Sequence, residues 1–548
     1  TPRFCYHVSE FQSLIFLPCI TSSMDLDTSF LFSGISFNKK KFAADFARFQ
    51  TKQADPVEIS DNLNDVQSCN GPENIAIAKR KRKRNEDKLS VEGFDVFRSS
   101  ASSVPVKKEK KKNQGDEESK KELNKQIEQD AILRKRYNIH IAGSNVPSPL
   151  HDFSDLYTRY GCRKKLLKTW AELGFKEPTP IQRQAIPTLL SDRECFACAP
   201  TGSGKTFAFV CPLLMKLKPS PNESVKAVII SPTRELASQT ARECKRMASG
   251  SKLRIKFMTK QMSKNSDLTK RGCHILISTP YRLQLSVQNK RVDLSRVEYL
   301  VLDESDKLFE PCLLEQIDSV VKACSNPSLV RSLFSATLPD YVEDQARTIM
   351  HDAVRIIVGR KNTASETIKQ KLVYAGSEEG KLMALRQSFE ASLNPPVLIF
   401  VQSKERAKQL YGELKYDGVR VGVIHSDLSE SQREDAVDDF RSGKTWVLIA
   451  TDVVARGMDF KGVKCVINYD FPDCGAAYIH RIGRSGRAGR DGEALTFYTE
   501  DDIPFLHSIA NVISTSGCHV PHWIMNLPKN RWKNHRPRRD LISTNPFP

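Results

Sequence analysis

The sequence predicts an α/β protein with two domains, each built on a parallel β-sheet covered by helices. From about residue 150, short β-branched runs alternate with amphipathic stretches, as in "AVIISP", "HILIST", "YLVLDE" and "RSLFSAT". A second series begins near residue 370 with "VLIFVQ", "VGVIHS", "TWVLIAT" and "CVINYD". The polar stretch "GRKNTASETIKQ" separates the two series and is a predicted linker. A chain of 548 residues is also too long for a single core.

These patterns divide the chain into four predicted regions. We expect a largely disordered basic extension over residues 1–140, a first domain over 141–360, a second domain over 361–515 and a basic tail over 516–548. The extension carries "KRKRKR" at 79–84 and "KKEKKK" at 107–112, and blocks of like charge cannot bury a core. They are interpreted as a nuclear address and a phosphate-seeking arm, with a merely solvated tail as the alternative.

Four further expectations follow from the composition and from local sequence. The formal net charge of +19 predicts attraction to a polyanion, most simply a nucleic acid. No apolar run reaches the roughly 18 residues that a membrane helix needs, so no membrane partner is expected. The pair Cys195 and Cys198 lies where a buried strand is expected, which favours reduced core thiols over a metal site. Met24 is interpreted as the natural start, which makes residues 1–23 an extension without a function.

A glycine-rich loop between a predicted strand and a predicted helix indicates a phosphate site. The segment "APTGSGKT" fits the phosphate-loop pattern if Ala199 replaces its first glycine. Gly202 and Gly204 allow the backbone N–H groups to turn toward an anion, and the start of the next helix adds a positive dipole. Lys205 is expected to reach the β- and γ-phosphates, and the Thr206 hydroxyl to bind Mg²⁺.

The strand "YLVL" ends on two adjacent carboxylates, Asp303 and Glu304. Ligands of open α/β sheets bind at the carboxyl ends of the strands, so these acids and the phosphate loop are expected to converge. Asp303 would reach the metal, mostly through water, and Glu304 would orient or activate the attacking water. The alternative is a pair of surface acids beside a helix capped by Ser305 or Asp306.

The chain carries an ordered series of short motifs: "GFKEPTPIQ" at 174–182, "APTGSGKT" at 199–206, "PTRELASQ" at 232–239, "STP" at 278–280, "DESD" at 303–306, "SAT" at 335–337, "LIFVQS" at 398–403, "ATDVVARGMDF" at 450–460 and "HRIGRSGRAGR" at 480–490. This series resembles the DEAD-box RNA helicases of superfamily 2 over roughly residues 150–515. The resemblance implies two tandem RecA-like domains, ATP and Mg²⁺ as cofactors, and an RNA-stimulated ATPase that locally unwinds RNA duplexes.

The resemblance also implies a role for individual side chains. The catalytic groups would be Lys205, Asp303, Glu304, Arg484 and Arg487, with the two arginines acting as arginine fingers on the γ-phosphate. The nucleotide would be held by Phe175, Gln182, Ala199, Pro200, Thr201, Gly202, Ser203, Gly204, Lys205, Thr206 and Asp459, with Gln182 gripping adenine and Asp459 facing the ribose. The metal ligands would be Thr206 and Asp303. The RNA backbone would meet Pro232, Thr233, Arg234, Thr279, Thr451 and Arg456. Coupling of nucleotide state to domain closure would fall to Ser335, Thr337, Asp306 and His480.

The sequence departs from the family pattern at three places. Ser305 replaces the alanine of the name-giving motif, and we expect activity to survive because both acids remain. Tyr281 follows "TP" where a glycine is usual, and the paired glycines are absent from "FMTKQMSKNSDLTKRG". These two departures concern the grip on RNA in the first domain, and the sequence leaves their effect open.

A narrower resemblance concerns the segments flanking the two domains. "RKRYNIHIAGSNVPSPL" before the first domain and "WIMNLPK" after the second resemble the DEAD-box helicases of small-ribosomal-subunit biogenesis, with plant wording. This implies precursor ribosomal RNA as the substrate, pre-ribosomal assembly proteins as partners, a monomer, and a nuclear, nucleolar location. Two rivals stay open: an ATP-gated RNA clamp or assembly factor with little hydrolysis, and a processive DNA translocase, for which we find no extra domain.

Overall fold

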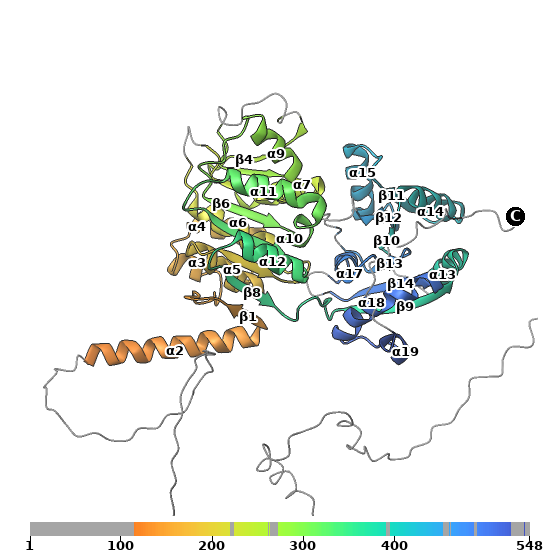
Figure 1. The fold of residues 1–548 in the computed structure, drawn as a ribbon, viewed down its shortest axis with the longest axis horizontal. Helices are drawn as coiled ribbons and strands as arrows, with labels where there is room; N and C mark the ends of the chain where they lie inside the picture. The colour runs from red at the N-terminus through yellow and green to blue at the C-terminus, as the bar shows by residue number, and fades with distance from the viewer. Residues whose placement is uncertain are drawn as a thin grey trace, which may run out of the picture. The chain divides into compact units, whose positions relative to one another are not determined.

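The structure is a computed structural model of the chain, in which two separate β-sheets carry the described fold (Figure 1). It describes residues 114–219, 224–260, 262, 272–390, 395–452, 460, 462–486, 490–527 and 542. The basic blocks at 79–84 and 107–112 therefore lie outside the described residues, as do Arg456, Asp459 and Arg487.

The first sheet has eight strands in the order β1-β8-β2-β7-β6-β3-β5-β4. All neighbouring pairs run parallel except β1 with β8, which is antiparallel. The strands are β1 Ile139–Ala142, β2 Cys195–Cys198, β3 Ala227–Ile230, β4 Ile255–Phe257, β5 Ile275–Ser278, β6 Tyr299–Asp303, β7 Val330–Ser335 and β8 Val354–Val358. Successive side chains of the central strands enter two different apolar cores, as the near-continuous β-branched runs predict.

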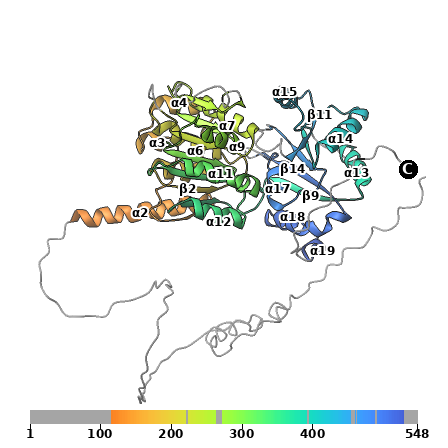
Figure 2. The ribbon, with the colours of Figure 1, turned by 45° about the horizontal axis from the view of Figure 1, so that its top comes forward.

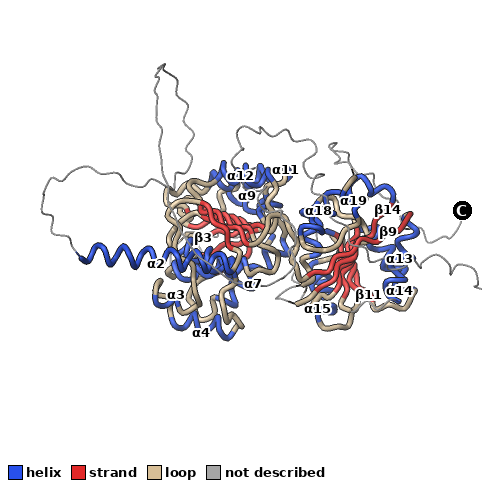
Figure 3. The backbone as a smooth tube through the Cα atoms, turned by 90° about the horizontal axis from the view of Figure 1, so that it is seen from below, coloured by secondary structure: helices blue, strands red, loops and turns tan. Residues whose placement is uncertain are grey.

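Helices cover both faces of this first sheet (Figure 3). One core includes side chains of α4 Lys164–Glu172, α5 Pro180–Leu190, α6 Lys205–Lys216 and α7 Arg234–Met247. The core on the opposite face includes side chains of α9 Pro280–Gln288, α10 Ser305–Leu308, α11 Pro311–Ala323 and α12 Asp340–Ile349. Two more helices precede β2 in the sequence: α2 Gln114–Arg136 and α3 Asp155–Thr158.

The second sheet has six strands in the order β11-β12-β10-β13-β14-β9, and every neighbouring pair is parallel. The strands are β9 Ile368–Gly376, β10 Val397–Val401, β11 Val421–Ile424, β12 Val447–Thr451, β13 Cys465–Asn468 and β14 Gly492–Thr499. The helices are α13 Glu378–Glu390, α14 Lys404–Tyr416, α15 Glu430–Arg441, α17 Gly475–Ile482, η3 Glu500–Asp502, α18 Ile503–Thr515 and α19 His522–Met525. Helices α17, α18 and α19 share one apolar core, and Figure 2 shows them as neighbours.

Two parallel-sheet α/β domains are therefore confirmed, with three local differences from the expectation. Helix α2, at residues 114–136, lies inside the extension expected to lack order, and β1 crosses its predicted boundary at residue 140. The predicted linker stops early because β9 begins at Ile368. Helix α19 lies inside the predicted tail. The expectation for Cys195 and Cys198 is confirmed, because both are buried free thiols on β2 and burial raises the pKa of Cys198 to about 11.

Candidate active site

A cavity of about 680 Å³ is lined by residues that belong to both sheets. Its first wall carries the phosphate loop, the paired acids and the inner face of α7, and its second wall carries residues 462–464 and the region after α17. The volume lies within the ~300–1,000 Å³ typical of small-ligand pockets. The sequence-predicted residues that line it are Phe175, Thr201, Gly202, Gly204, Lys205, Thr206, Asp303, Glu304 and Arg484.

The phosphate loop connects β2 to α6 and requires glycine at two positions. Gly202 has φ +76° and Gly204, at the N-cap of α6, has φ +89°, a region that L side chains rarely adopt. The Lys205 ammonium donates hydrogen bonds to the carbonyls of Ala199 at 2.7 Å and Pro200 at 2.9 Å. Burial lowers the pKa of Lys205, and the nearby Asp303 carboxylate opposes that effect. The lysine is thus held inside the curl of the loop, where an anion would attract it.

Gln182 ties the first turn of α5 to the phosphate loop. Its Oε1 accepts a hydrogen bond from the Thr179 backbone N–H at 3.0 Å, and its Nε2 donates to the Gly204 carbonyl at 3.0 Å. A Cβ at Gly204 would lie 2.3 Å from that Nε2, so only glycine allows this approach. Gln182 is thus hydrogen-bonded to the phosphate loop, and its grip on adenine stays a prediction.

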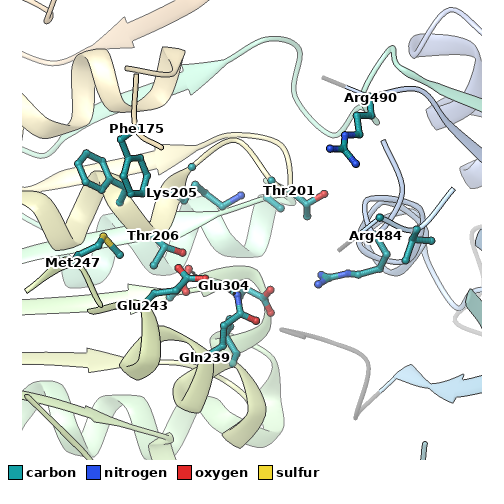
Figure 4. A pocket seen from close by; sticks show the side chains of 18 of the residues that line it. Phe175, Thr201, Lys205, Thr206, Gln239, Glu243, Met247, Glu304, Arg484 and Arg490 are labelled. Carbon is teal, nitrogen blue, oxygen red and sulfur yellow. Dashed lines mark hydrogen bonds between the residues drawn. The ribbon is translucent and has the colours of Figure 1, made fainter. Parts of the chain in front are cut away.

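Phe175 is placed where a base could reach it. Its ring lines the cavity and stacks on Phe207, with centroids 4.2 Å apart and planes 24° apart (Figure 4). One face of the Phe175 ring therefore packs against Phe207, and this contact fixes the orientation of the Phe175 ring at the cavity.

The paired acids are buried at the end of β6, beside the phosphate loop. Asp303 is 4% exposed and Glu304 is 8% exposed. Asp303 Oδ1 accepts a hydrogen bond from the Glu304 backbone N–H at 3.0 Å. Burial and the neighbouring Glu304 charge raise the pKa of Asp303 to about 7, although Lys205 acts in the opposite direction. The interpretation as surface acids beside a capped helix is wrong, because both acids are buried and no side chain caps α10.

Glu304 is held in an unusual backbone conformation. It is a non-glycine residue with φ +50°, a left-handed conformation that costs free energy and recurs at functional sites. Its Oε2 is buried and has no hydrogen-bond partner among the described residues. The strained backbone therefore presents one carboxylate oxygen with free acceptor capacity, as a group that orients water requires.

Asp306 is the meeting point of the coupling residues. Its Oδ2 lies 2.7 Å from His480 Nε2 of α17 and accepts hydrogen bonds from the backbone N–H and the hydroxyl of Thr337. Ser335 contributes indirectly, because its hydroxyl donates to the Thr337 carbonyl at 2.6 Å. Burial alone would raise the pKa of Asp306, but the charge and hydrogen bond of His480, with that of Thr337, hold it below its usual value. Asp306, which follows β6 of the first sheet, is thus hydrogen-bonded to His480 of α17, a helix of the second domain.

The second wall of the cavity supplies two guanidinium groups. Arg484 is 4% exposed, and its Nε donates to the His480 carbonyl at 3.1 Å, which holds the stem against α17. Figure 4 shows Arg484 and Arg490 extending from this wall toward the side that carries Glu304 and Thr201. Arg487 lies outside the described residues, so its expected position stays a prediction.

Comparisons with known proteins agree with this geometry. Residues 179–345 match the family described as DEAD/DEAH box helicase, and residues 380–489 match the helicase conserved C-terminal domain. The chain is 62% identical over 532 residues to a DEAD-box ATP-dependent RNA helicase 57 of Arabidopsis thaliana, covering 95% of this chain and 98% of that protein. The chain belongs to the DEAD-box RNA helicases.

Other relatives of this DEAD-box protein carry related names. It is 41% identical to a probable ATP-dependent RNA helicase DDX52 of Rattus norvegicus, over 95% of this chain and 89% of that one. It is 43% identical to an ATP-dependent RNA helicase ROK1 of Kluyveromyces lactis, over 81% of each chain. Among solved structures it is similar to S. cerevisiae Dbp5 bound to RNA and ADP BeF3, with TM-score 0.59, 32% identity, and coverage of 66% of this chain and 92% of that one.

The residues of this DEAD-box protein fit a nucleotide with a metal ion. Ser203 Oγ in the phosphate loop and Glu304 Oε2 are buried without hydrogen-bond partners among the described residues, and Lys205 is directed into the loop. Within the same described residues, no cluster of three or more His, Cys, Asp or Glu side chains could hold a metal ion alone. Mg²⁺ usually takes one or two protein groups together with phosphates and water. Thr206 and Asp303 both line the cavity and would hold it, and the ion would neutralise phosphate charge.

The candidate RNA contacts of this helicase fall in two places. Pro232, Thr233 and Arg234 precede or begin α7, and Thr279 is the N-cap of α9. Strands β3 and β5 are parallel neighbours, so these four residues lie at adjoining strand ends. Thr451 ends β12 in the second sheet. Arg456 lies outside the described residues.

Gln239, Glu243 and Arg490 are among the cavity residues that have no role in the sequence-based predictions. Gln239 and Glu243 are one turn apart on α7, with Gln239 Nε2 donating to Glu243 Oε1 at 3.2 Å, and Arg490 lines the second wall of the same cavity. The helical spacing after "PTREL" could have placed the first two on one face of α7. Arg490 closes the last quoted motif, but its sequence gives no signal that separates it from the other basic residues.

No helix within the described residues is both long and apolar enough to cross a membrane.

Proposed function

We propose that this protein binds ATP with Mg²⁺ in the cavity between its two sheets and hydrolyses the ATP when RNA is bound. The observation that carries the proposal is the division of the site: Lys205 and the paired acids stand on one wall, and Arg484 stands on the other. Asp303 would hold the metal, Glu304 would orient the attacking water, and Arg484 would face the terminal phosphate. Hydrolysis then requires both walls to be in place, which ties turnover to closure.

The second part of the proposal concerns RNA. ATP and single-stranded RNA would both favour the closed arrangement, so each would strengthen the binding of the other. The relatives named ATP-dependent RNA helicases support the choice of RNA, and so does the similarity to the RNA-bound Dbp5 structure. Closure on a single strand would disrupt a neighbouring duplex locally, and reopening after hydrolysis would release it. Contacts to the backbone predict little sequence preference.

The test is ATP hydrolysis with and without RNA, compared between the parent protein and Glu304→Gln. We expect RNA to stimulate the parent, and the variant to lose about 10²- to 10⁴-fold in rate while still binding RNA and nucleotide together. Glu315→Gln on the exposed face of α11 is the matched control and should behave like the parent. Equal rates with and without RNA would contradict the coupling, and parental turnover in Glu304→Gln would contradict the role of that carboxylate.

The finer part of the proposal is a role in the maturation of the small ribosomal subunit. The segments before and after the two domains resemble helicases of that process, and the excess of positive charge suits binding to a polyanion. The RNA would then be precursor ribosomal RNA, the partners pre-ribosomal assembly proteins, and the location the nucleolus. Crosslinking the protein to cellular RNA and sequencing the captured RNA tests this directly. Recovery of spliced messages instead of precursor ribosomal RNA would overturn it.

A further inference from the structure

The starts of α7 and α9 lie beside each other at one edge of the first sheet. Strands β3 and β5 pair in parallel with Ile230 opposite Ser278, and the Ser231 N–H donates to the Ser278 carbonyl at 3.1 Å just beyond the strands. The N-cap residues Thr233 and Thr279 follow within a few residues. Two helix N-termini, each with a positive dipole end, are therefore brought to the same place.

Two arginine side chains lie at this place, and one of them, Arg234, is ion-paired through its Nη2 with Glu430 of α15. Arg234 begins α7, and its Nε is buried without a hydrogen-bond partner among the described residues. Arg282 lies in the first turn of α9 and donates to the Met258 carbonyl at 3.2 Å. Burial lowers the pKa of Arg282 and the like charge of Arg234 lowers it further, whereas the carboxylates of Glu430 and Glu235 act in the opposite direction. Both guanidinium groups and the two helix N-termini are groups that can also bind an RNA phosphate.

Tyr281 stands within this cationic edge. It occupies the position after "TP" where the family usually has glycine, between the N-cap Thr279 and Arg282. Its side chain is 62% exposed, and no hydrogen bond or ring contact to it is found within the described residues. Pro280, at the first position of α9, is buried and fixes the backbone from which the ring projects. A rigid backbone thus presents a large, uncommitted aromatic face next to the candidate phosphate contacts.

We propose that Tyr281 is a stacking platform for one base of the bound single strand, a contact that a glycine at this position cannot make. The inference rests on the proposed RNA binding and extends it from the backbone to a base. Every base has a π-face, so stacking on a tyrosine ring strengthens binding without demanding a sequence.

The test measures the affinity of Tyr281→Ala for a short single-stranded RNA in the presence of a non-hydrolysable ATP analogue. We expect a loss of about 5- to 150-fold, which corresponds to the roughly 1–3 kcal/mol found for base stacking on aromatic side chains. Tyr281→Phe keeps the ring and should bind like the parent. Tyr416→Ala, at a tyrosine that is 91% exposed at the end of α14, is the matched control and should also bind like the parent.

Two further readouts separate stacking from a general loss of grip. In a set of RNAs that each lack one base, the parent should lose affinity at one position, and Tyr281→Ala should be insensitive to base removal at that same position. The slope of log affinity against log salt should be unchanged in Tyr281→Ala, because a neutral ring releases no counterion, whereas Arg234→Ala should reduce that slope by about 0.7.

The outcomes distinguish this inference from the function on which it rests. If the parent binds RNA and its ATPase is stimulated, but Tyr281→Ala binds within twofold of the parent, only the stacking platform is refuted. If Tyr281→Ala weakens binding yet still responds to every missing base as the parent does, the stacking platform is likewise refuted. If the parent itself binds no RNA, the proposed function and this inference both fail.

Discussion

The contact between Asp306 and His480 predicts how strongly nucleotide and RNA binding are coupled. Both side chains are almost completely buried, at 1% and 2% exposed, and they belong to elements of different sheets. Replacing His480 by alanine removes one of the three hydrogen bonds to Asp306 Oδ2, while Asp306 Oδ1 already has no partner within the described residues. The carboxylate would therefore stay buried with donors from Thr337 alone.

The size of the effect follows from the kind of contact that is lost. A hydrogen bond to a charged group contributes about 1.5–3 kcal/mol, which corresponds to about 10- to 150-fold in an equilibrium constant. Because the contact spans the two sheets, the loss should fall on closure and not on nucleotide binding to the first wall alone. The factor by which RNA tightens the binding of an ATP analogue should drop by that amount in His480→Ala.

The assay is a titration of a fluorescent ATP analogue with and without saturating RNA, for the parent, His480→Ala and His507→Ala. The control residue His507 lies on α18, where its ring Nδ1 is hydrogen-bonded to Asn511 of the same helix. We expect the affinity without RNA to be similar in all three proteins. A coupling factor in His480→Ala within twofold of the parent value would refute the reasoning, because the contact would then contribute nothing to closure.

Three other predictions concern the acids, the contact between α7 and α15, and the close approach of α17. The folded protein keeps a proton on Asp303 up to about pH 7, whereas the unfolded chain loses that proton near pH 4. The free energy of unfolding should therefore fall by up to about 4 kcal/mol as the pH rises across this window. Calorimetry should find this fall missing in Asp303→Asn. Glu235 and Arg433 form a 3.1 Å ion pair between α7 and α15, so Arg433→Glu should lower RNA-stimulated ATPase activity several-fold and the charge swap with Glu235→Arg should restore it; failure of the swap would count against the pair. A Cβ at Gly483 would lie 1.9 Å from Thr201 Oγ1. Gly483→Ala should therefore reduce RNA-stimulated turnover at least tenfold with unchanged thermal stability, and adding Thr201→Ala should partly restore the turnover. Full activity in Gly483→Ala would contradict this close contact between Gly483 and Thr201.

The features of the fold and site that depend on the strand pattern can be predicted from the sequence. The buried runs predict the strands of both sheets, and the rule that ligands bind at carboxyl strand ends predicts that Asp303 and Glu304 lie beside the phosphate loop, as they do. The convergence of Thr337 and His480 on Asp306 also follows from the motif series. In each case the local pattern and the global fold require the same arrangement.

The features that the sequence does not reveal depend on long-range geometry or on weak local signals. Helix α2 has no apolar stripe to mark it, and its charged sequence resembles a solvated tail. The bond from Gln182 to the Gly204 carbonyl joins residues 22 positions apart, and nothing local marks it. Glu304 adopts a left-handed backbone conformation that its residue type does not favour. Such departures from local rules are expected where function sets the geometry.

The central claim is that one nucleotide is held between two walls and that Arg484 acts on its terminal phosphate from the second wall. The most direct measurement is a crystal structure of the protein with RNA, Mg²⁺ and an ATP analogue. We expect the guanidinium of Arg484 within hydrogen-bonding distance, about 2.7–3.2 Å, of a terminal-phosphate oxygen, opposite Lys205 and Glu304. A guanidinium directed away from that phosphate while RNA is bound would contradict the account.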